Sequence, residues 1–203
     1  IPNYDHMPLF AAGPEYSGMT GIAPYTRGNE MLTWEKLNTY NLALKLGFFN
    51  RVELNAELYH KKTTDMLMEV PITLGNGTAM EWDNIGAMVN RGIEANVNVH
   101  LLQHKDFNWY INAVASYNHN EITELYNGLD EYEIPGANIL LKVGHSYGEH
   151  YLVRYAGVNP ANGDALWYTK DGDITNEYDE EDKVLLGKSA VAPWQGGFGT
   201  TLS

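Results

Sequence analysis

The segment Gly144-His145-Ser146-Tyr147-Gly148 carries the residue types of a nucleophile elbow. It fits the G-x-S-x-G pattern, and the apolar run at residues 139–143 would supply the strand before such a turn. In that fold the acid and then the histidine of the triad follow the serine, but no histidine comes after His150. The residues after Gly148 also alternate with a period of two, unlike a helix. A serine hydrolase acting through Gly144, Ser146 and Gly148 is therefore a remote alternative, and we expect no enzymatic activity.

Histidine and carboxylate spacing gives little support for a metal site. The nearest histidine pairs are His100 with His104 and His145 with His150. The first pair has the spacing of one helical turn but lies at an expected strand end. The acidic run Asp179-Glu180-Glu181-Asp182 offers the oxygen ligands that Ca²⁺ prefers, but the spacing of its carboxylates does not fit an EF-hand loop. We expect exposed or interface histidines, a solvated acidic loop, no metal and no other cofactor.

Composition narrows the class of protein. The chain has 26 acidic and 13 basic residues, a net charge of −13, so we do not expect binding to nucleic acid or to anionic lipid headgroups as its main activity. It has no cysteine and therefore no disulfide framework. The first residue is Ile1, and the last segment stops in an extended pattern. We therefore expect an internal or processed piece of a longer chain.

Four segments alternate apolar and polar residues, which predicts β-strands with one wet and one apolar face. Each runs for about ten residues, longer than strands of globular sheets and close to the 9–11 residues of a strand that crosses a bilayer. The apolar positions are Tyr40-Leu42-Leu44-Leu46-Phe48, Val52-Leu54-Ala56-Leu58, Ile93-Ala95-Val97-Val99-Leu101 and Trp109-Ile111-Ala113-Ala115-Tyr117. Aromatic residues stand at both ends of the first and last sets, as in the interfacial girdles of membrane proteins.

The connections between these strands are alternately short and long, which is typical of transmembrane barrels with short periplasmic turns and long outer loops. The pattern predicts an all-β protein, a fragment of an antiparallel transmembrane β-barrel forming one domain. Its expected parts are a loop at 1–36, a strand hairpin at 37–62, an extracellular loop at 63–91, a second hairpin at 92–122, a large extracellular loop at 123–193 and the start of the next strand at 194–203.

Several blocks of sequence resemble the C-terminal barrel half of SusC-like (SusC/RagA) TonB-dependent outer-membrane transporters. They occur in the family's order over nearly the whole chain. The blocks are Gly28-Asn29-Glu30-Met31-Leu32-Thr33-Trp34-Glu35-Lys36, Tyr40-Asn41, Tyr59-His60-Lys61-Lys62-Thr63-Thr64-Asp65, Asn84-Ile85-Gly86, Asn90-Arg91-Gly92-Ile93-Glu94, Tyr155-Ala156-Gly157-Val158-Asn159-Pro160 with Gly163, and Pro193 with Gly196-Gly197-Phe198.

The resemblance implies a plugged barrel of about 22 strands, of which about five would lie in this chain. It implies TonB-dependent active import of oligosaccharides, or of peptides in some members, across the outer membrane of a Gram-negative, Bacteroidetes-type bacterium. The implied partners are a SusD-like surface lipoprotein that acts as a lid, the TonB energy-coupling complex acting through an N-terminal part not in this sequence, the ligand itself and outer-membrane lipid.

Two sets of residues are the candidates for function. Positions opposite the apolar faces would line the lumen, where amides and carboxylates suit a wet wall or contact with the plug. Aromatic residues and amides in the long loops suit sugar rings, or else pack loop against loop or against the lid. The lumen-facing set is Glu53, Asn55, Glu57, Glu94, Asn96 and Asn98. The ligand-contacting set is Trp82, Asp83, Asn84, Tyr147, Tyr151, Trp167 and Tyr168.

A secreted all-β carbohydrate-binding module is the main alternative. It would share the Tyr- and Gly-rich composition, but it would need closed strand pairing within the 203 residues. It would also be soluble without detergent, whereas exposed apolar strand faces would make the barrel fragment aggregate in water.

Overall fold

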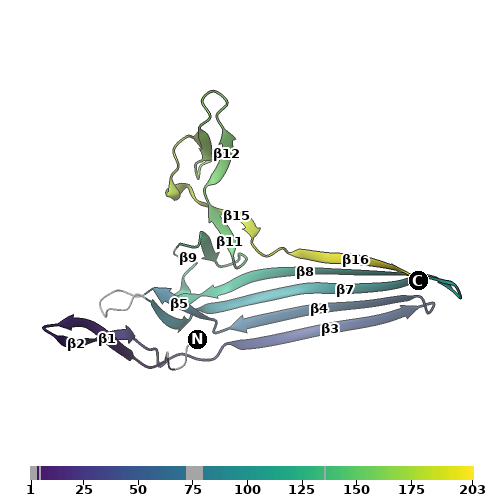
Figure 1. Ribbon diagram of the computed structural model, residues 1–203, viewed down its shortest axis with the longest axis horizontal. Coiled ribbons are helices and arrows are strands. Elements are labelled where there is room, and N and C mark those ends of the chain that lie inside the picture. Colours follow the sequence, from purple (N-terminus) through teal and green to yellow (C-terminus); the bar gives the residue numbers. More distant parts are fainter. Residues whose placement is uncertain (1–3, 5, 72–79, 135) are drawn as a thin grey trace.

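A single large antiparallel sheet of five long strands dominates the computed structural model, which describes residues 1–203 except 1–3, 5, 72–79 and 135 (Figure 1). The strands lie in the order β16-β8-β7-β4-β3. They are β3 (Lys36–Phe48), β4 (Val52–Thr64), β7 (Gly86–His104), β8 (Phe107–Leu125) and β16 (Trp194–Leu202). The expected all-β antiparallel class is confirmed. No described segment forms a helix that is long and apolar enough to cross a membrane.

The predicted strand positions agree with this sheet, although two strands are longer than expected. β7 and β8 have 19 residues each and begin or end beyond the expected 92–122 segment. The register is continuous over the middle of the sheet, with irregularities between Ala87 and Met88 and between His100 and Leu102. β16 pairs with β8 from Trp194↔Tyr117 to Leu202↔Trp109. The segment at 194–203 is therefore a strand of this same sheet.

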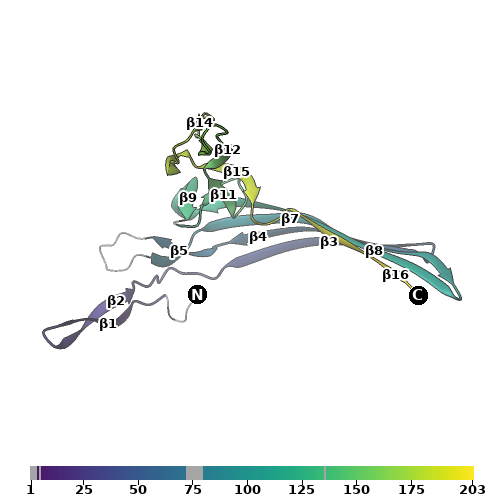
Figure 2. The same cartoon turned by 45° about the horizontal axis from the view of Figure 1, so that its top comes forward.

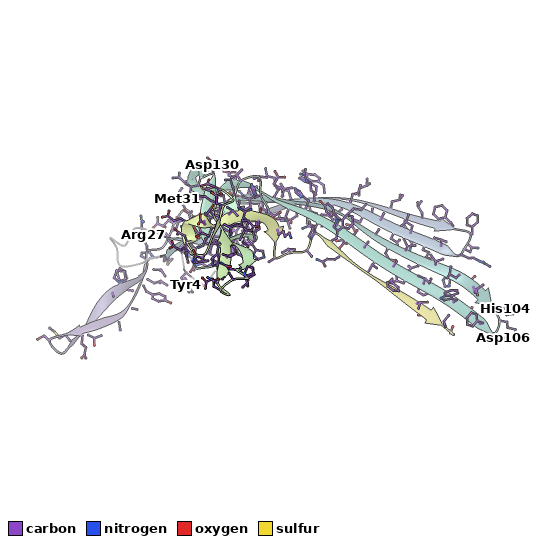
Figure 3. The ribbon with its side chains drawn as sticks, turned by 90° about the horizontal axis from the view of Figure 1, so that it is seen from above. Tyr4, Arg27, Met31, His104, Asp106 and Asp130 are labelled. Carbon is purple, nitrogen blue, oxygen red and sulfur yellow. The ribbon has the colours of Figure 1, made fainter. Side chains whose placement is uncertain are left out.

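Short turns join the strands at one end of the sheet. Phe49 and Asn50 both have positive φ, 55° and 54°, as in the type I′ turns that match the twist of a hairpin. The second turn, between β7 and β8, includes Asp106, which lies with His104 at the end opposite Arg27, Met31 and Asp130 (Figure 3). The long connections all gather at that opposite end, so the expected sorting of connections by length is observed (Figures 1 and 2).

The long connections are not structureless, which corrects the expectation of plain loops. The segment at 1–36 contains the hairpin of β1 (Leu9–Tyr16) and β2 (Met19–Thr26), and the segment at 63–91 contains β5 (Leu67–Pro71) and β6 (Met80–Asn84). The β1–β2 register shifts between Leu9 and Phe10 and between Ala12 and Glu15. Such irregularities interrupt the period-two pattern on which the strand prediction depended.

The segment at 123–193 forms two small sheets above the end of the large one (Figure 1). Part of this segment is a hairpin around Asn159 to Gly163, in which Tyr155 pairs with Trp167. The first small sheet is β9 (Glu131–Ile134), β10 (Ile139–Lys142), β11 (Glu149–Leu152) and β15 (Val184–Ser189), and the second is β12 (Arg154–Val158), β13 (Ala165–Tyr168) and β14 (Ile174–Thr175). The short 3₁₀ turns are η2 (Tyr126–Gly128) and η3 (Glu180–Asp182).

Among the described residues, the buried hydrophobic cluster lies where the first small sheet meets the large one. Ile122 and Leu125 of β8 pack with Leu141 of β10, and Tyr132 and Ile139 close the cluster. Along the rest of the large sheet the outward apolar side chains lack a cover within the described residues: Leu42 is 69% exposed and Phe198 85%. A water-soluble sheet would bury such a face, so this face calls for an apolar cover.

Candidate functional site

The register brings the six predicted lumen residues onto one face of the sheet. β4 and β7 pair through Glu53↔Asn98, Asn55↔Asn96 and Glu57↔Glu94. Directly opposed residues of neighbouring strands project from the same side. The opposite side carries Leu54↔Val97 and Leu58↔Ile93 in the same two strands. Polar and apolar chemistry are therefore separated cleanly between the two faces.

Hydrogen bonds between side chains hold the polar face together. Asn98 Oδ1 accepts from the Tyr110 hydroxyl at 2.6 Å and from Asn112 Nδ2 at 2.7 Å. Asn96 Oδ1 is buried and has no hydrogen-bond partner among the described residues. A hollow of about 730 Å³ lies over this part of the sheet and is lined in part by Asn55, Glu57 and Glu94. The face can thus offer amide and carboxylate oxygens to a polar solute or to a covering polypeptide.

A second network of amides continues this face towards the long connections. Asn90 Oδ1 accepts from Asn118 Nδ2 at 3.3 Å and from Asn120 Nδ2 at 3.0 Å. The Tyr59 hydroxyl donates to Asn118 Oδ1 at 2.8 Å. Asn120 Oδ1 accepts from the backbone N–H of Tyr147 at 2.6 Å. This amide network, made of Tyr59, Asn90, Asn118 and Asn120, ties three strands of the wall to the turn before β11.

A cavity of about 770 Å³ opens above the amide network, between the end of the sheet and the segment at 123–193. Asn90 and Asn120 line it from the sheet, and Tyr147 and Lys188 line it from the other side. The Tyr147 side chain is 41% exposed. Its backbone is held by Asn120 and by the Ser189 hydroxyl, which donates to Tyr147 O. The ring is therefore presented by a fixed backbone, and the cavity combines an aromatic face with amides and one lysine, a chemistry that suits polar ligands.

The buried carboxylate of Glu149 fixes the turn that carries Tyr147. Glu149 is 4% exposed, and its Oε1 accepts from the backbone N–H of Gly187 at 2.6 Å. Its Oε2 lies 3.0 Å from His145 Nδ1. Hydrogen bonds to both carboxylate oxygens offset the cost of burying this group. Glu149 thus joins β11 to β15 behind the cavity.

The G-x-S-x-G segment does not have the geometry of a nucleophile elbow. It connects two strands, β10 and β11, without the helix that such an elbow precedes. The Ser146 hydroxyl donates to Asn120 O at 2.9 Å, and His145 faces Glu149 instead of the serine. The segment fits the G-x-S-x-G pattern because this tight turn needs glycine at two positions: Gly144 and Gly148 have φ of 83° and 74°. Ser146 serves to fasten this turn to β8.

The second-loop candidates Trp82, Asp83 and Asn84 lie on β6 and fasten neighbouring segments together. Asn84 Nδ2 donates to Thr33 O and to Asp65 O, while Asn84 Oδ1 accepts from the Thr33 N–H. Asp83 Oδ1 and Trp82 O both accept from Asn29 Nδ2. These contacts use the polar atoms for packing, and the structure does not bring the three residues to the cavity beside Tyr147.

The remaining candidates lie in the small sheets. Trp167 packs edge-on between Tyr155 at 5.4 Å and Tyr178 at 5.1 Å, measured between ring centroids. Tyr168 stacks under the Arg154 guanidinium at 5.1 Å. Tyr151 is half-buried in β11, where it pairs with Leu185 of β15. Of the seven predicted ligand contacts, Tyr147 alone lines the cavity above the amide network.

The residues considered as metal ligands have other contacts. The His100 ring packs against the Tyr110 ring at an interplanar angle of 54°, with ring centroids 5.1 Å apart. Asp179 caps η3 by accepting from the Glu181 N–H, and Asp182 Oδ1 accepts from the Lys170 N–H. Near this turn Lys183 Nζ lies 3.0 Å from Glu180 and 3.4 Å from Glu133. The hydrogen bond to Glu180 raises the pKa of the Lys183 amine, which keeps it charged at neutral pH.

Sequence reasoning missed the roles of Tyr59, Asn90 and Asn120. The pattern Asn118-His119-Asn120 was a usable signal, because two amides two residues apart on one strand must share a face. The contact of Asn120 with the turn at Tyr147 depends on how the segment at 123–193 folds back, and no local pattern reveals that.

Comparisons with known proteins agree with this architecture. A family model described as TonB dependent receptor-like, beta-barrel, matches residues 7–201. TonB-dependent receptor SusC of Bacteroides thetaiotaomicron is 31% identical over 210 aligned residues, covering 93% of this chain and 20% of SusC. TonB-dependent receptor P39 of Formosa agariphila is 31% identical over 159 residues, covering 78% of this chain and 15% of that protein.

Solved structures agree as well. The RagAB peptide transporter matches all of this chain with a TM-score of 0.91 and 31% identity, over 23% of the matched chain. The open-open state of the RagAB peptide importer matches with a TM-score of 0.87 and 33% identity. The chain thus spans between 15% and 23% of the length of these relatives. It belongs to the TonB-dependent receptor-like β-barrel family and is a homologue of SusC.

Proposed function

We propose that the full-length protein imports oligosaccharides across the outer membrane in a TonB-dependent step, with peptides as the alternative cargo. The observation that carries this proposal is the two-faced sheet, in which Asn55↔Asn96 and Leu54↔Val97 stand on opposite sides of the same strand pair. A sheet of this kind suits the wall between a wet lumen and lipid. The family is one of the outer membrane, so the chain forms part of an outer-membrane barrel of a Gram-negative, Bacteroidetes-type bacterium.

In this proposal the two short turns lie in the periplasm, and the end bearing the long connections faces outside. The five-stranded sheet ends at β3 and β16, which do not pair with each other in the part of the chain that the structure describes. This arrangement suits a wall that further strands continue, whereas the alternative of a secreted carbohydrate-binding module requires a closed sheet. TonB would act through a part of the protein outside this chain.

A SusD-like surface lipoprotein is the proposed lid at the outer end. Support comes from apolar side chains of the β1–β2 hairpin, which projects beyond the large sheet (Figure 1). Phe10 is 65%, Ile22 79% and Tyr25 68% exposed. Exposed apolar groups in such numbers favour a protein partner.

We expect mild detergent extraction of the full-length protein from its native cells to yield a co-purifying surface lipoprotein, identified by mass spectrometry. Purification of a small soluble protein that needs no detergent would refute the barrel and the lid together.

Solute contact is proposed at the cavity above the amide network. Tyr147 would stack on a sugar ring while Asn90 and Asn120 bond its hydroxyl groups, since sugar rings present apolar faces edged by hydroxyls. A peptide backbone would use the same amides. Uptake of labelled neutral oligosaccharides and of labelled short peptides, measured side by side in cells that make the full-length protein, distinguishes the two cargoes.

The change Tyr147→Ala tests this contact. We expect the concentration for half-maximal uptake to rise by about two- to twelvefold, because an aromatic contact contributes about 0.5–1.5 kcal/mol. Tyr147→Phe should keep uptake close to that of the unchanged protein, because the ring remains. Tyr126→Ala is the matched control, because Tyr126 is 39% exposed and does not line this cavity. Equal uptake by the Tyr147→Ala and unchanged proteins, at equal surface levels, would refute the contact.

A further inference from the structure

The apolar face of the large sheet ends in a row of basic side chains. Strand pairing places Tyr40, His60, Arg91 and His119 side by side across β3, β4, β7 and β8. They share the face of the apolar residues, since each stands two positions from one of them on its strand. The next row on this face contains Leu42, Leu58, Ile93, Tyr117 and Trp194. The basic row therefore lies at the edge of the apolar band nearest the long connections.

Ionisable side chains first appear on the apolar face at this row. The four successive rows from Leu42 to Phe48 contain no ionisable Asp, Glu, Lys, Arg or His on this face. Above them stand His60, Arg91 and His119, and one row further Lys62 and Glu121. The chain as a whole has a net charge of −13, so a mainly basic edge is a local departure from its composition.

Arg91 has N–H donors that its ion pair with Glu121 does not use. One terminal nitrogen of Arg91 lies 3.2 Å from Glu121 Oε2, and His119 Nε2 lies 3.6 Å from the same oxygen. The Arg91 side chain is 58% exposed, and a guanidinium has five N–H donors. Glu121 thus orients Arg91 and His119 without occupying all their donors. The His60 ring lies beside the Tyr40 ring, with centroids 6.4 Å apart, and is exposed.

A groove of about 840 Å³ runs from the basic row onto the apolar band. Its apolar part includes Leu42, Leu58 and Ile93, and Arg91 and His119 stand at its other end. Aliphatic side chains below a guanidinium and imidazoles match the two parts of a lipid, an acyl chain and a phosphate.

We propose that this groove binds an outer-leaflet lipid whose headgroup carries a phosphate and a net negative charge. The phosphate contacts Arg91 and His60, with Lys62 and His119 near it, and one acyl chain lies along Leu42, Leu58 and Ile93. The proposal rests on the outward assignment of this face made under the proposed function. The lipid site and the outward face can be tested separately, because Leu54→Arg tests the outward face without touching the basic row.

The test measures lipid retained by the full-length protein. The protein is purified in mild detergent, mixed with phosphatidylglycerol or phosphatidylcholine at equal concentration, and analysed by native mass spectrometry. We expect phosphatidylglycerol to be retained in clear preference to phosphatidylcholine. Arg91→Gln should reduce this preference by about fivefold, the effect of one basic residue at an anionic lipid surface, and adding His60→Gln should reduce it further.

The controls separate lipid recognition from folding. Arg91→Lys keeps the positive charge and should retain most of the preference, whereas Lys105→Gln removes a cation from the short-turn end and should change nothing. The double change His60→Gln with His119→Gln keeps the test valid if Arg91→Gln prevents assembly. Equal retention of the two lipids by the unchanged protein would overturn the proposal. Unchanged preference in both the Arg91→Gln and the double-histidine variants would also overturn it.

Discussion

Leu54→Arg should lower the free energy of unfolding of the membrane-inserted protein by about 2–4 kcal/mol, the cost of an Arg on the lipid face near the bilayer midplane. Leu54 lies in the middle of the apolar band, opposite Val97 on β7 and Leu46 on β3. A guanidinium there loses its hydration and meets no carboxylate on this face. Val97→Arg should have a similar cost. Denaturant titration of the full-length protein in lipid vesicles measures the effect.

The matched control is Glu53→Arg. Glu53 is next to Leu54 on the same strand and at the same depth, but it stands on the polar face opposite Asn98. We expect a change within about 0.5 kcal/mol, as for substitutions at hydrated positions. Equal losses for Leu54→Arg and Glu53→Arg, or normal assembly and stability of both Leu54→Arg and Val97→Arg, would contradict the assignment of the two faces.

Gly92→Ala should destabilise the sheet by about 2–4 kcal/mol. A methyl group at Gly92 would overlap the Tyr117 carbonyl oxygen and would lie 2.6 Å from the Tyr59 hydroxyl. Forcing a methyl into such a space costs about 1–3 kcal/mol, and loss of the Tyr59–Asn118 hydrogen bond costs about 1 kcal/mol more. Because Tyr59 belongs to the amide network, cargo uptake should fall together with stability.

Gly47→Ala is the control for this change. Gly47 lies in β3 of the same sheet, and a methyl group there would have no neighbour within 4 Å. It should alter the free energy of unfolding by less than about 0.5 kcal/mol, as for open surface sites. The comparison is made on the full-length protein in vesicles by denaturant titration and by uptake. A Gly92→Ala protein as stable as Gly47→Ala would show that the close approach of Tyr59 and Tyr117 is not tight.

The large sheet could be predicted because alternation is a local property. A strand with residues of one kind at every second position fixes its own faces, so Glu53 and Glu57 had to share a side whatever their neighbours. The partner strand adds Asn98 and Glu94 to that side, and the observed register bears this out. Family resemblance added the barrel, which period-two spacing alone does not distinguish from a sandwich.

The site beyond the sheet could be predicted only in part. Tyr147 was identified from its residue type and loop position, and it does line the cavity. Trp167 is also an aromatic residue in this long connection, but its ring packs between those of Tyr155 and Tyr178. Tyr155 is its partner across the β12–β13 hairpin, and Tyr178 lies in a later turn. The side-chain amide of Asn84 likewise donates its hydrogen bonds to the backbone oxygens of Thr33 and Asp65. In each case the deciding contact is remote in sequence, so residue type cannot distinguish a packed side chain from an available one.

The confinement of the buried core to one end of the sheet has a consequence for assembly. Ile122, Leu125 and Leu141 exclude water with protein alone, so the cluster around them can form in water by the hydrophobic effect. The rows from Leu42 to Phe48 have no such partner among the described residues, and on the proposed lipid-facing side they are stabilised when hydrocarbon replaces water. One end of β8 is therefore stabilised in water, and the other end is stabilised in hydrocarbon. A single free energy of unfolding therefore does not describe the whole chain. Denaturant should disrupt the end with the buried cluster first, and removal of lipid should disrupt the apolar rows first.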